Sequence, residues 1–138
     1  MIASVLGVKF NTLKTAGNFN NEVGLPLTIF NIREEHEAAV LEMGISDFGE
    51  MHRLSKVARP DICVLTNIGF CHLEFLGDRD GVLRAKSEIF DFAAPNAKAI
   101  VNGDDDKLHT LKSRDDLSCT TFGMDASNDI YAKNVENL

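Results

Sequence analysis

The sequence predicts an α/β fold in which a parallel sheet is flanked by helices. Three short apolar segments lack polar-apolar alternation, as expected of strands covered on both faces: 38–43, 62–66 and 97–101. Segments with apolar residues at helical spacing follow two of these strands, at 50–59 and 81–93. Strands that alternate with helices through short connections favour right-handed crossovers and therefore a parallel sheet.

The first part of the chain is predicted to contain two helices and a weak strand. Residues 1–8 are apolar and predict the end of a helix, with Gly7 as its terminator. No capping residue precedes this helix, so we expect either that its start lies upstream or that Met1 begins a short, frayed segment. Residues 12–15 form a weak strand candidate, and 23–30 a helix with Pro26 in its first turn.

The later elements are separated by turn residues and prolines. Pro60 and Pro95 end the helices before them. A short helix is predicted at 108–114 and a fourth strand at 119–122. The alternating segment 130–135 predicts a fifth strand with one exposed face.

Composition and charge limit the classes of function. With 138 residues and 44% hydrophobic content, the chain can form one core, so we expect one domain. A formal net charge of −7 argues against nucleic-acid binding, because phosphate backbones are bound by clusters of Lys and Arg. Any phosphorylated ligand would require a metal ion, a helix N-terminus or a basic loop.

The cysteines and the absence of targeting signals indicate the cell interior. The odd count, Cys63, Cys71 and Cys119, fits a reducing compartment better than a disulfide framework. Cys71 and the adjacent His72 lack the second ligand pair that a zinc site requires. Neither a signal peptide nor a membrane-spanning run of about 20 apolar residues is recognisable. We therefore expect a soluble, cytoplasmic protein with no membrane insertion.

Polar residues follow three of the predicted strands. Glu42 lies in the segment 38–43, His72 follows 62–66, and Asn102 follows 97–101. Ligands of open α/β sheets bind beyond the carboxyl ends of the strands, so we expect these side chains at one edge of the sheet. A solvated loop with no ligand is the alternative for each of them.

Glu42 is the most informative of these residues. A carboxylate within an apolar strand costs several kcal/mol unless it is paired, hydrogen-bonded or bound to a metal. An ion pair with a neighbouring basic residue is one solution. A site for Mg²⁺ or Mn²⁺ formed with His72 is the other, because a carboxylate, an imidazole and several waters suit these ions. The acidic run at 104–106 predicts a solvated turn or a helix N-terminus.

Five segments carry a resemblance to a known family: 15–28 with its Gly-Asn-Phe-Asn-Asn sequence, 39–44, 66–74, 85–90 and 101–105. In this order they resemble the central ATP-binding domain of the Mur ligases, and the similarity extends to about residue 122. The resemblance implies a phosphate-loop-type α/β domain that catalyses ATP-driven amide formation through an acyl phosphate. It is strongest to the member that adds D-alanyl-D-alanine to UDP-N-acetylmuramoyl-tripeptide in peptidoglycan synthesis.

The resemblance also implies roles for individual residues. Glu42 and His72 would hold Mg²⁺, and His72 would belong to the catalytic site with Lys86. Lys86 would be carbamylated, which converts a cation that repels the metal into an anion that supports it. The ATP-binding residues would be Asn102, which would contact adenine, and three others: Asp104, Asn20 and Asn21.

The sequence departs from the family pattern at its ends. The glycine-rich phosphate loop with its Lys-Thr pair, which the family places before the helix predicted at 1–8, does not occur within residues 1–138, and neither do the flanking N-terminal and C-terminal domains. Residues 1–138 are therefore expected to be a partial central ATP-binding domain, incomplete at its N-terminal side and inactive in isolation. A ligase similar to folylpolyglutamate synthetase and a non-catalytic binding remnant of a truncated ligase are the alternatives.

Overall fold

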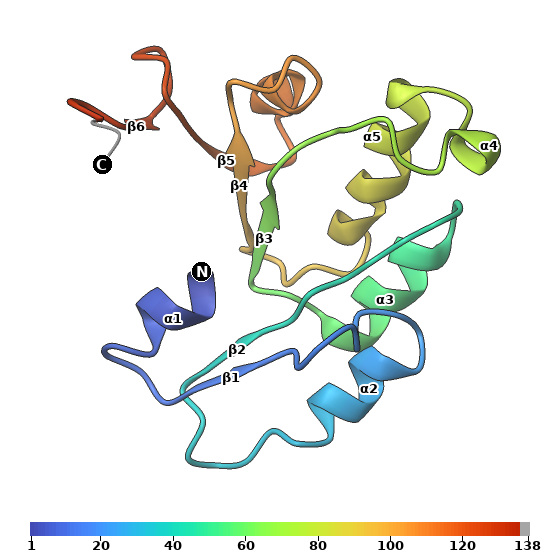
Figure 1. Ribbon diagram of the computed structural model, residues 1–138, viewed down its shortest axis with the longest axis vertical. Coiled ribbons are helices and arrows are strands. Elements are labelled where there is room, and N and C mark those ends of the chain that lie inside the picture. The colour runs from blue at the N-terminus through green and yellow to red at the C-terminus, as the bar shows by residue number, and fades with distance from the viewer. Residues whose placement is uncertain (136–138) are drawn as a thin grey trace.

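Residues 1–135 are described by the computed structural model, and they form an α/β fold with parallel strands, as predicted (Figure 1). The strands form two sheets. Strand β1 (Thr12–Lys14) pairs with β2 (Ala38–Val40), with Thr12 opposite Ala38. The larger sheet has the order β3-β4-β5-β6.

All pairs in the larger sheet are parallel, and its bounds are β3 Ile62–Leu65, β4 Lys98–Asn102, β5 Ser118–Gly123 and β6 Ile130–Tyr131. The sequence predicted that Glu42, His72 and Asn102 lie at one edge of a single sheet, and the two separate sheets do not agree with this prediction. Within residues 1–135, β2 is hydrogen-bonded to β1 and not to β3, so Glu42 follows a strand of a different sheet from the strands that precede His72 and end at Asn102.

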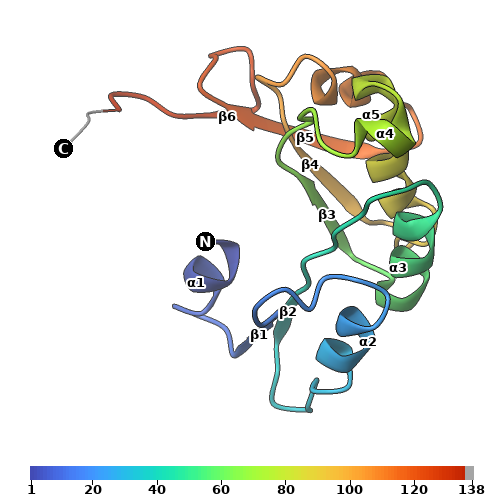
Figure 2. The ribbon, with the colours of Figure 1, turned by 45° about the vertical axis from the view of Figure 1, so that its right-hand side comes forward.

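The longer helices gather along one flank of the strands (Figure 2). They are α2 (Gly24–Ile29), α3 (Glu50–Ala58) and α5 (Arg79–Ser87), whereas α1 (Ile2–Leu6) lies on the opposite flank. Pro26 stands in the first turn of α2, where its missing N–H costs no helical hydrogen bond.

Three short helical segments complete the fold: α4 Leu73–Leu76 and the 3₁₀ helices η1 Glu88–Phe90 and η2 Leu108–Ser113. Helix α4 was not predicted from the sequence. Helix α5 begins two residues earlier than predicted, because Asp78 caps it by accepting a hydrogen bond from the backbone N–H of Gly81 at 2.8 Å.

The one-sided arrangement of helices explains the burial pattern of the strands. In β3, Cys63 and Leu65 are buried, whereas Ile62 is 57% exposed. The prediction that this strand is covered on both faces was therefore wrong. The buried face packs against α5 through Val82 and Ala85, and full burial of a valine side chain such as that of Val82 contributes roughly 1.5–3 kcal/mol.

The last strand is shorter than predicted. It contains Ile130 and Tyr131, and both are exposed, so the expected alternation between a buried and an exposed face is not present. Among residues 1–135, no helix combines the length and apolar character that a membrane crossing requires.

Candidate functional site

The backbone immediately after β3 brings two predicted site residues together. Lys86, half-buried on α5, donates a hydrogen bond from Nζ to the carbonyl oxygen of Asn67 at 2.9 Å. Asn102, the last residue of β4, donates from Nδ2 to the carbonyl oxygen of Thr66 at 3.0 Å. One side chain from a helix and one from a strand thus bind consecutive carbonyls at the carboxyl end of β3.

His72 lies at the start of α4 in the left-handed backbone conformation, with φ of 55°. Few residues other than glycine adopt this conformation, and it directs the chain sharply from the loop into the helix. The exposed imidazole lines an open cavity of about 520 Å³, whose other polar lining side chains include Asn20, Asn21, Ser46 and Glu50. The structure therefore places three of the predicted residues around one cavity.

Glu42 lies beyond the end of β2 and is exposed. The premise that its carboxylate is buried in an apolar strand was wrong, because β2 ends at Val40 and no burial cost needs to be offset. Its backbone N–H donates to Thr15 Oγ1 at 2.8 Å, and its Oε1 accepts from Asn20 Nδ2 at 3.3 Å. Glu42 is linked in this way to the side chain of Asn20 at the cavity.

The loop that carries Asn20 and Asn21 is held against the start of α2. Asn21 Oδ1 accepts hydrogen bonds from the backbone N–H groups of Val23 and Gly24, at 3.1 and 2.8 Å. The carbonyl of Asn20 accepts from the N–H of Gly44 at 2.8 Å. The Asn21 oxygen therefore accepts hydrogen bonds from the N–H groups at the start of α2, whereas the Asn20 amide points to the Glu42 carboxylate.

Asn102 and Asp104 have contacts that stabilise their own loop. Asn102 Oδ1 accepts from the N–H of Asp104 at 3.0 Å. The Asp104 carboxylate accepts from the N–H of Met124 at 2.5 Å and from Asn128 Nδ2 at 2.7 Å. These donors hold the pKa of Asp104 below its usual range, chiefly through the Met124 N–H. Asp104 thus anchors the turn between β5 and β6, and its role in nucleotide binding stays a prediction.

The donor atoms suit a hard divalent cation. The cavity region offers the Glu42 carboxylate, the Asn20 amide oxygen and the His72 imidazole, and Mg²⁺ prefers oxygen ligands and retains several waters. Across the described part of the chain, no three His, Cys, Asp or Glu side chains converge as a complete protein-derived metal cage. The residues fit a water-rich magnesium site, which stays a prediction for Glu42 and His72.

A larger cavity of about 700 Å³ lies at the opposite end of the larger sheet, where Ala97 and Leu117 precede β4 and β5. It is lined by none of the predicted site residues. Ligands of open α/β sheets bind at the carboxyl ends of the strands, so the smaller cavity beside His72 is the better candidate.

Sequence reasoning missed the contribution of Asp105. Its side chain is only 9% exposed, so the prediction of a solvated turn was wrong for this residue. Asp105 Oδ1 accepts from the N–H groups of Lys107 and Leu108, which confirms the predicted helix N-terminus. Its Oδ2 accepts from the N–H of Ile68 at 2.8 Å, a contact between residues 37 positions apart that no local pattern predicts.

Comparison with known proteins gives consistent matches over nearly the whole chain. A family model described as the Mur ligase middle domain matches residues 1–138. The UDP-N-acetylmuramoyl-tripeptide–D-alanyl-D-alanine ligase of Bacillus subtilis (strain 168) is 42% identical over 98% of this chain. The ligase of the same name from Escherichia coli (strain K12) is 39% identical over 75% of it.

Solved structures agree with the sequence comparison. A crystal structure of MurF from Acinetobacter baumannii has a TM-score of 0.88 and 35% identity, and the match covers 98% of this chain. MurF ligase from Thermotoga maritima, solved in complex with ADP, has a TM-score of 0.79 and 37% identity over 91% of this chain. The chain spans 29% of the length of the Bacillus relative and 30% of the Acinetobacter structure.

Proposed function

Because the chain belongs to the Mur ligase family, whose middle domain it matches, we propose that it is the central ATP-binding domain of a peptidoglycan ligase. The ligase would add D-alanyl-D-alanine to UDP-N-acetylmuramoyl-tripeptide. The observation that carries this proposal is the 42% identity, over 98% of the chain, to a ligase named for that reaction. The proposed location is the cytoplasm, where ATP is available.

Nucleotide binding is the first part of the proposed function. The ADP complex of the Thermotoga relative supports it, as does the position of Asn102 at the carboxyl end of β4. Asn102 would contact adenine, and Asp104 would support the same loop through its bonds to the β5–β6 turn. Asn20 and Asn21 would lie near the phosphates. Asn20 Nδ2 donates to Glu42, so the other end of the Asn20 amide, its oxygen Oδ1, would face the ligand.

Activation of the acyl substrate is the second part. The substrate carboxylate would accept the γ-phosphoryl group of ATP, and the amine of D-alanyl-D-alanine would then displace phosphate to form the amide. Magnesium, when bound by Glu42 and His72, would neutralise phosphate charge during this transfer. The chain's own contribution is to hold Glu42 against Asn20 by a hydrogen bond, while Asn20 and His72 line the same cavity.

Lys86 would act as a carbamate in this scheme. Its ammonium group extends from α5 and donates to the carbonyl of Asn67. Asn67 lies in the loop that leads from β3 to His72. Carbon dioxide adds to the neutral amine and a proton is released, so that the cation becomes a carboxylate-bearing side chain. The carbamate would complement the positive metal where an ammonium would oppose it.

The named relatives favour this function over the alternatives. A ligase similar to folylpolyglutamate synthetase would share the architecture, but the ligases reported above are named for D-alanyl-D-alanine addition. A non-catalytic remnant would retain the fold and lose the reaction. An assay of the whole ligase that contains these residues distinguishes the three classes.

The test is phosphate release by that whole ligase with ATP, magnesium and UDP-N-acetylmuramoyl-tripeptide. We expect release to depend on D-alanyl-D-alanine and not on glutamate. Dependence on glutamate with a folate substrate would favour the synthetase, and no release with either amine would favour the remnant. Either result would overturn the proposal.

A further inference from the structure

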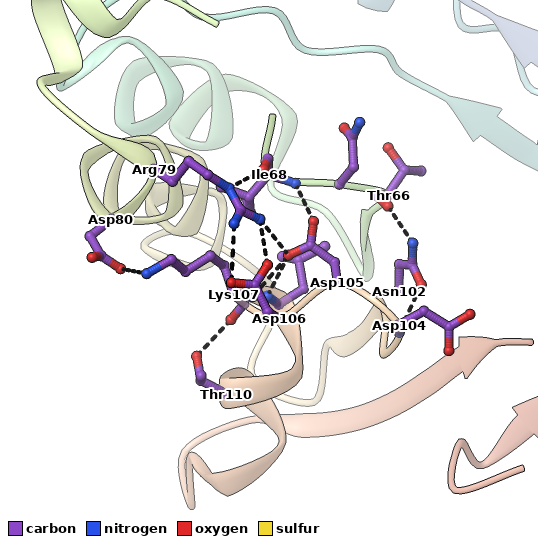
Figure 3. A network of polar contacts seen from close by, with 12 residues as sticks. Thr66, Ile68, Arg79, Asp80, Asn102, Asp104, Asp105, Asp106, Lys107 and Thr110 are labelled. Carbon is purple, nitrogen blue, oxygen red and sulfur yellow. Dashed lines mark hydrogen bonds and ion pairs between the residues drawn. The ribbon is translucent and has the colours of Figure 1, made fainter. Parts of the chain in front are cut away.

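The loop from Thr66 to His72, called the 66–72 loop below, is held by side chains rather than by strand pairing at its beginning. Three consecutive carbonyls each accept a hydrogen bond from a different side chain, and Figure 3 shows the bonds to Thr66 and Ile68. Asn102 donates to Thr66, Lys86 to Asn67 at 2.9 Å, and Arg79 Nε to Ile68 at 2.9 Å. Two of the donors are proposed site residues, and Arg79 has no assigned role.

Asp105 binds the same stretch of backbone from the other side. Its Oδ2 accepts from the N–H of Ile68 at 2.8 Å, while its Oδ1 accepts from the N–H groups of Lys107 and Leu108, each at 3.0 Å. One carboxylate therefore joins the 66–72 loop to the first turn of η2. Both oxygens are used, and the side chain is only 9% exposed.

Arg79 completes the arrangement. Besides its bond to the carbonyl of Ile68, its guanidinium donates to both carboxylate oxygens of Asp106, at 2.6 and 3.1 Å, and lies 3.7 Å from Asp105 Oδ1. The hydrogen bonds with Asp106 raise the pKa of Arg79 and lower the pKa of Asp106, so the pair stays charged. Ile68, which is 2% exposed, thus has both backbone groups satisfied by charged side chains.

We propose that Asp105 and Arg79 are positioning residues that set the geometry of the 66–72 loop, and through it the placement of Lys86 and His72 for catalysis. This inference rests on the proposed ligase function. Neither residue needs to touch a substrate. Their effect is transmitted by the backbone of Ile68, which directly follows the carbonyl that binds Lys86 and lies four residues before His72.

The energetics of burial explain why the loop depends on them. A buried N–H or C=O without a hydrogen-bond partner is costly, so loss of either partner favours movement of Ile68 towards water. Such a movement shifts the Asn67 carbonyl away from Lys86. Metal and catalytic groups depend strongly on their supporting contacts, and loss of one such contact typically costs roughly 10- to 100-fold in activity.

Asp105→Asn is the most direct variant because it preserves shape. An amide has one oxygen acceptor and one NH₂ donor, so it cannot accept from Ile68 and from the η2 turn at once. The NH₂ group would face one of these N–H donors. Asp116→Asn is the matched control, because the exposed Asp116 carboxylate pairs with Arg114 near the start of β5, at the other end of the sheet.

The first measurement is hydrogen-deuterium exchange of the whole ligase without substrates. We expect the peptide that contains residues 66–72 to exchange faster in Asp105→Asn than in the parent, and to exchange at the parental rate in Asp116→Asn. Arg79→Gln should accelerate the same peptide, which provides a second variant if Asp105→Asn does not fold. Unchanged exchange in both folded variants would overturn the inference whether or not the ligase function holds.

The second measurement is steady-state kinetics at a temperature well below each variant's melting temperature. We expect kcat to fall roughly 10- to 100-fold in Asp105→Asn and Arg79→Gln, with a higher magnesium requirement. Asp116→Asn should stay within about twofold of the parent, since exposed ion pairs contribute little. The Asp105→Asn and Arg79→Gln losses should be less than additive in the double variant, because both act through Ile68.

The outcomes separate the inference from the function on which it rests. Faster exchange of the loop with parental kcat would overturn the positioning role and leave the ligase function intact. A lower melting temperature with parental kcat would show a purely structural role and also overturn it. An inactive parent ligase would overturn the proposed function, and with it any role of these residues in turnover.

Discussion

Lys86 Nζ lies 2.9 Å from the carbonyl oxygen of Asn67 and donates a hydrogen bond to it. The contact joins the last turn of α5 to the backbone after β3, and the half-buried lysine has its ammonium group directed towards the strand end. A lysine that merely covered apolar surface would place its charged group in water. The contact therefore favours a specific role for the Lys86 amine.

Replacement of Lys86 tests its carbamylation in the whole ligase. Lys86→Ala should be nearly inactive and should be partly rescued by added short carboxylates such as acetate, which can occupy the vacated space. Lys86→Arg should not be rescued, because the guanidinium stays charged and fills the site. Activity assays with and without acetate provide the measurement, and parental activity in Lys86→Arg would contradict the prediction.

Glu42→Ala should affect turnover much more than stability. The Glu42 side chain is exposed and its carboxylate has one long hydrogen bond, 3.3 Å to Asn20, so we expect the free energy of unfolding to change by about 0.5 kcal/mol or less. The magnesium concentration for half-maximal activity should rise if Glu42 holds the ion.

Urea unfolding and a magnesium titration of the whole ligase measure the two effects of Glu42→Ala. Glu34→Ala, at another exposed glutamate, is the matched control and should leave both quantities unchanged. A large loss of stability without a change in magnesium requirement would assign Glu42 a structural role instead.

Gly24→Ala should destabilise the loop that carries Asn20 and Asn21. A Cβ at Gly24 would lie 2.4 Å from the Cα of Phe19, so the loop or the start of α2 must move. Overpacking of this kind costs typically about 1–3 kcal/mol. Gly69→Ala is the control, because a Cβ there has no atom within 4 Å. Thermal unfolding of the two variants checks the prediction, and equal melting temperatures would refute it.

The carboxylate of Asp129 should contribute a pH-dependent part of stability. It accepts from the backbone N–H of Thr121 at 2.8 Å, and also from the Thr121 hydroxyl and Lys112 Nζ. These contacts, led by the Thr121 N–H, lower the pKa of Asp129 from 3.8 to about 2. Because the folded state binds this proton less tightly, the stabilisation is present above about pH 4 and is lost as the pH falls towards 2.

Asp129→Asn removes this titration. The variant should be less stable than the parent at pH 7, and its free energy of unfolding should fall less steeply between pH 4 and pH 2. Urea unfolding across this range measures the slope, with Asp115→Asn at an exposed aspartate as the control. A parental slope in Asp129→Asn would show that other carboxylates dominate the acid limb.

The sequence named the candidate site residues but did not predict which of them lie together. Asn20, Asn21 and His72 line one cavity, and Lys86 and Asn102 bind consecutive carbonyls after β3. Their roles towards ATP and magnesium stay predictions. The contact between Asp105 and Ile68 was not foreseeable, because an aspartate before η2 has a sufficient local explanation in its hydrogen bonds to the N–H groups of Lys107 and Leu108.

The fold class and the order of the strands and longer helices were determined by the sequence itself. Apolar periodicity, prolines and capping residues act over a few positions, so they can be recognised along the chain, as at Pro26 in α2 and Pro60 after α3. The family resemblance is likewise a property of the sequence, and the family match over residues 1–138 confirms it.

Only the tertiary structure decided which strands pair, which side chains are buried and which distant residues are in contact. It divided the strands into two sheets, left Ile62 exposed because the longer helices gather on the other face, and placed Glu42 in solvent beyond β2. It also brought Asp105 to Ile68, 37 positions away. The division into two sheets and the contact of Asp105 with Ile68 both use backbone groups that find partners far away in the chain. Since every residue except proline carries the same N–H and C=O groups, the sequence holds no local mark of which ones will pair.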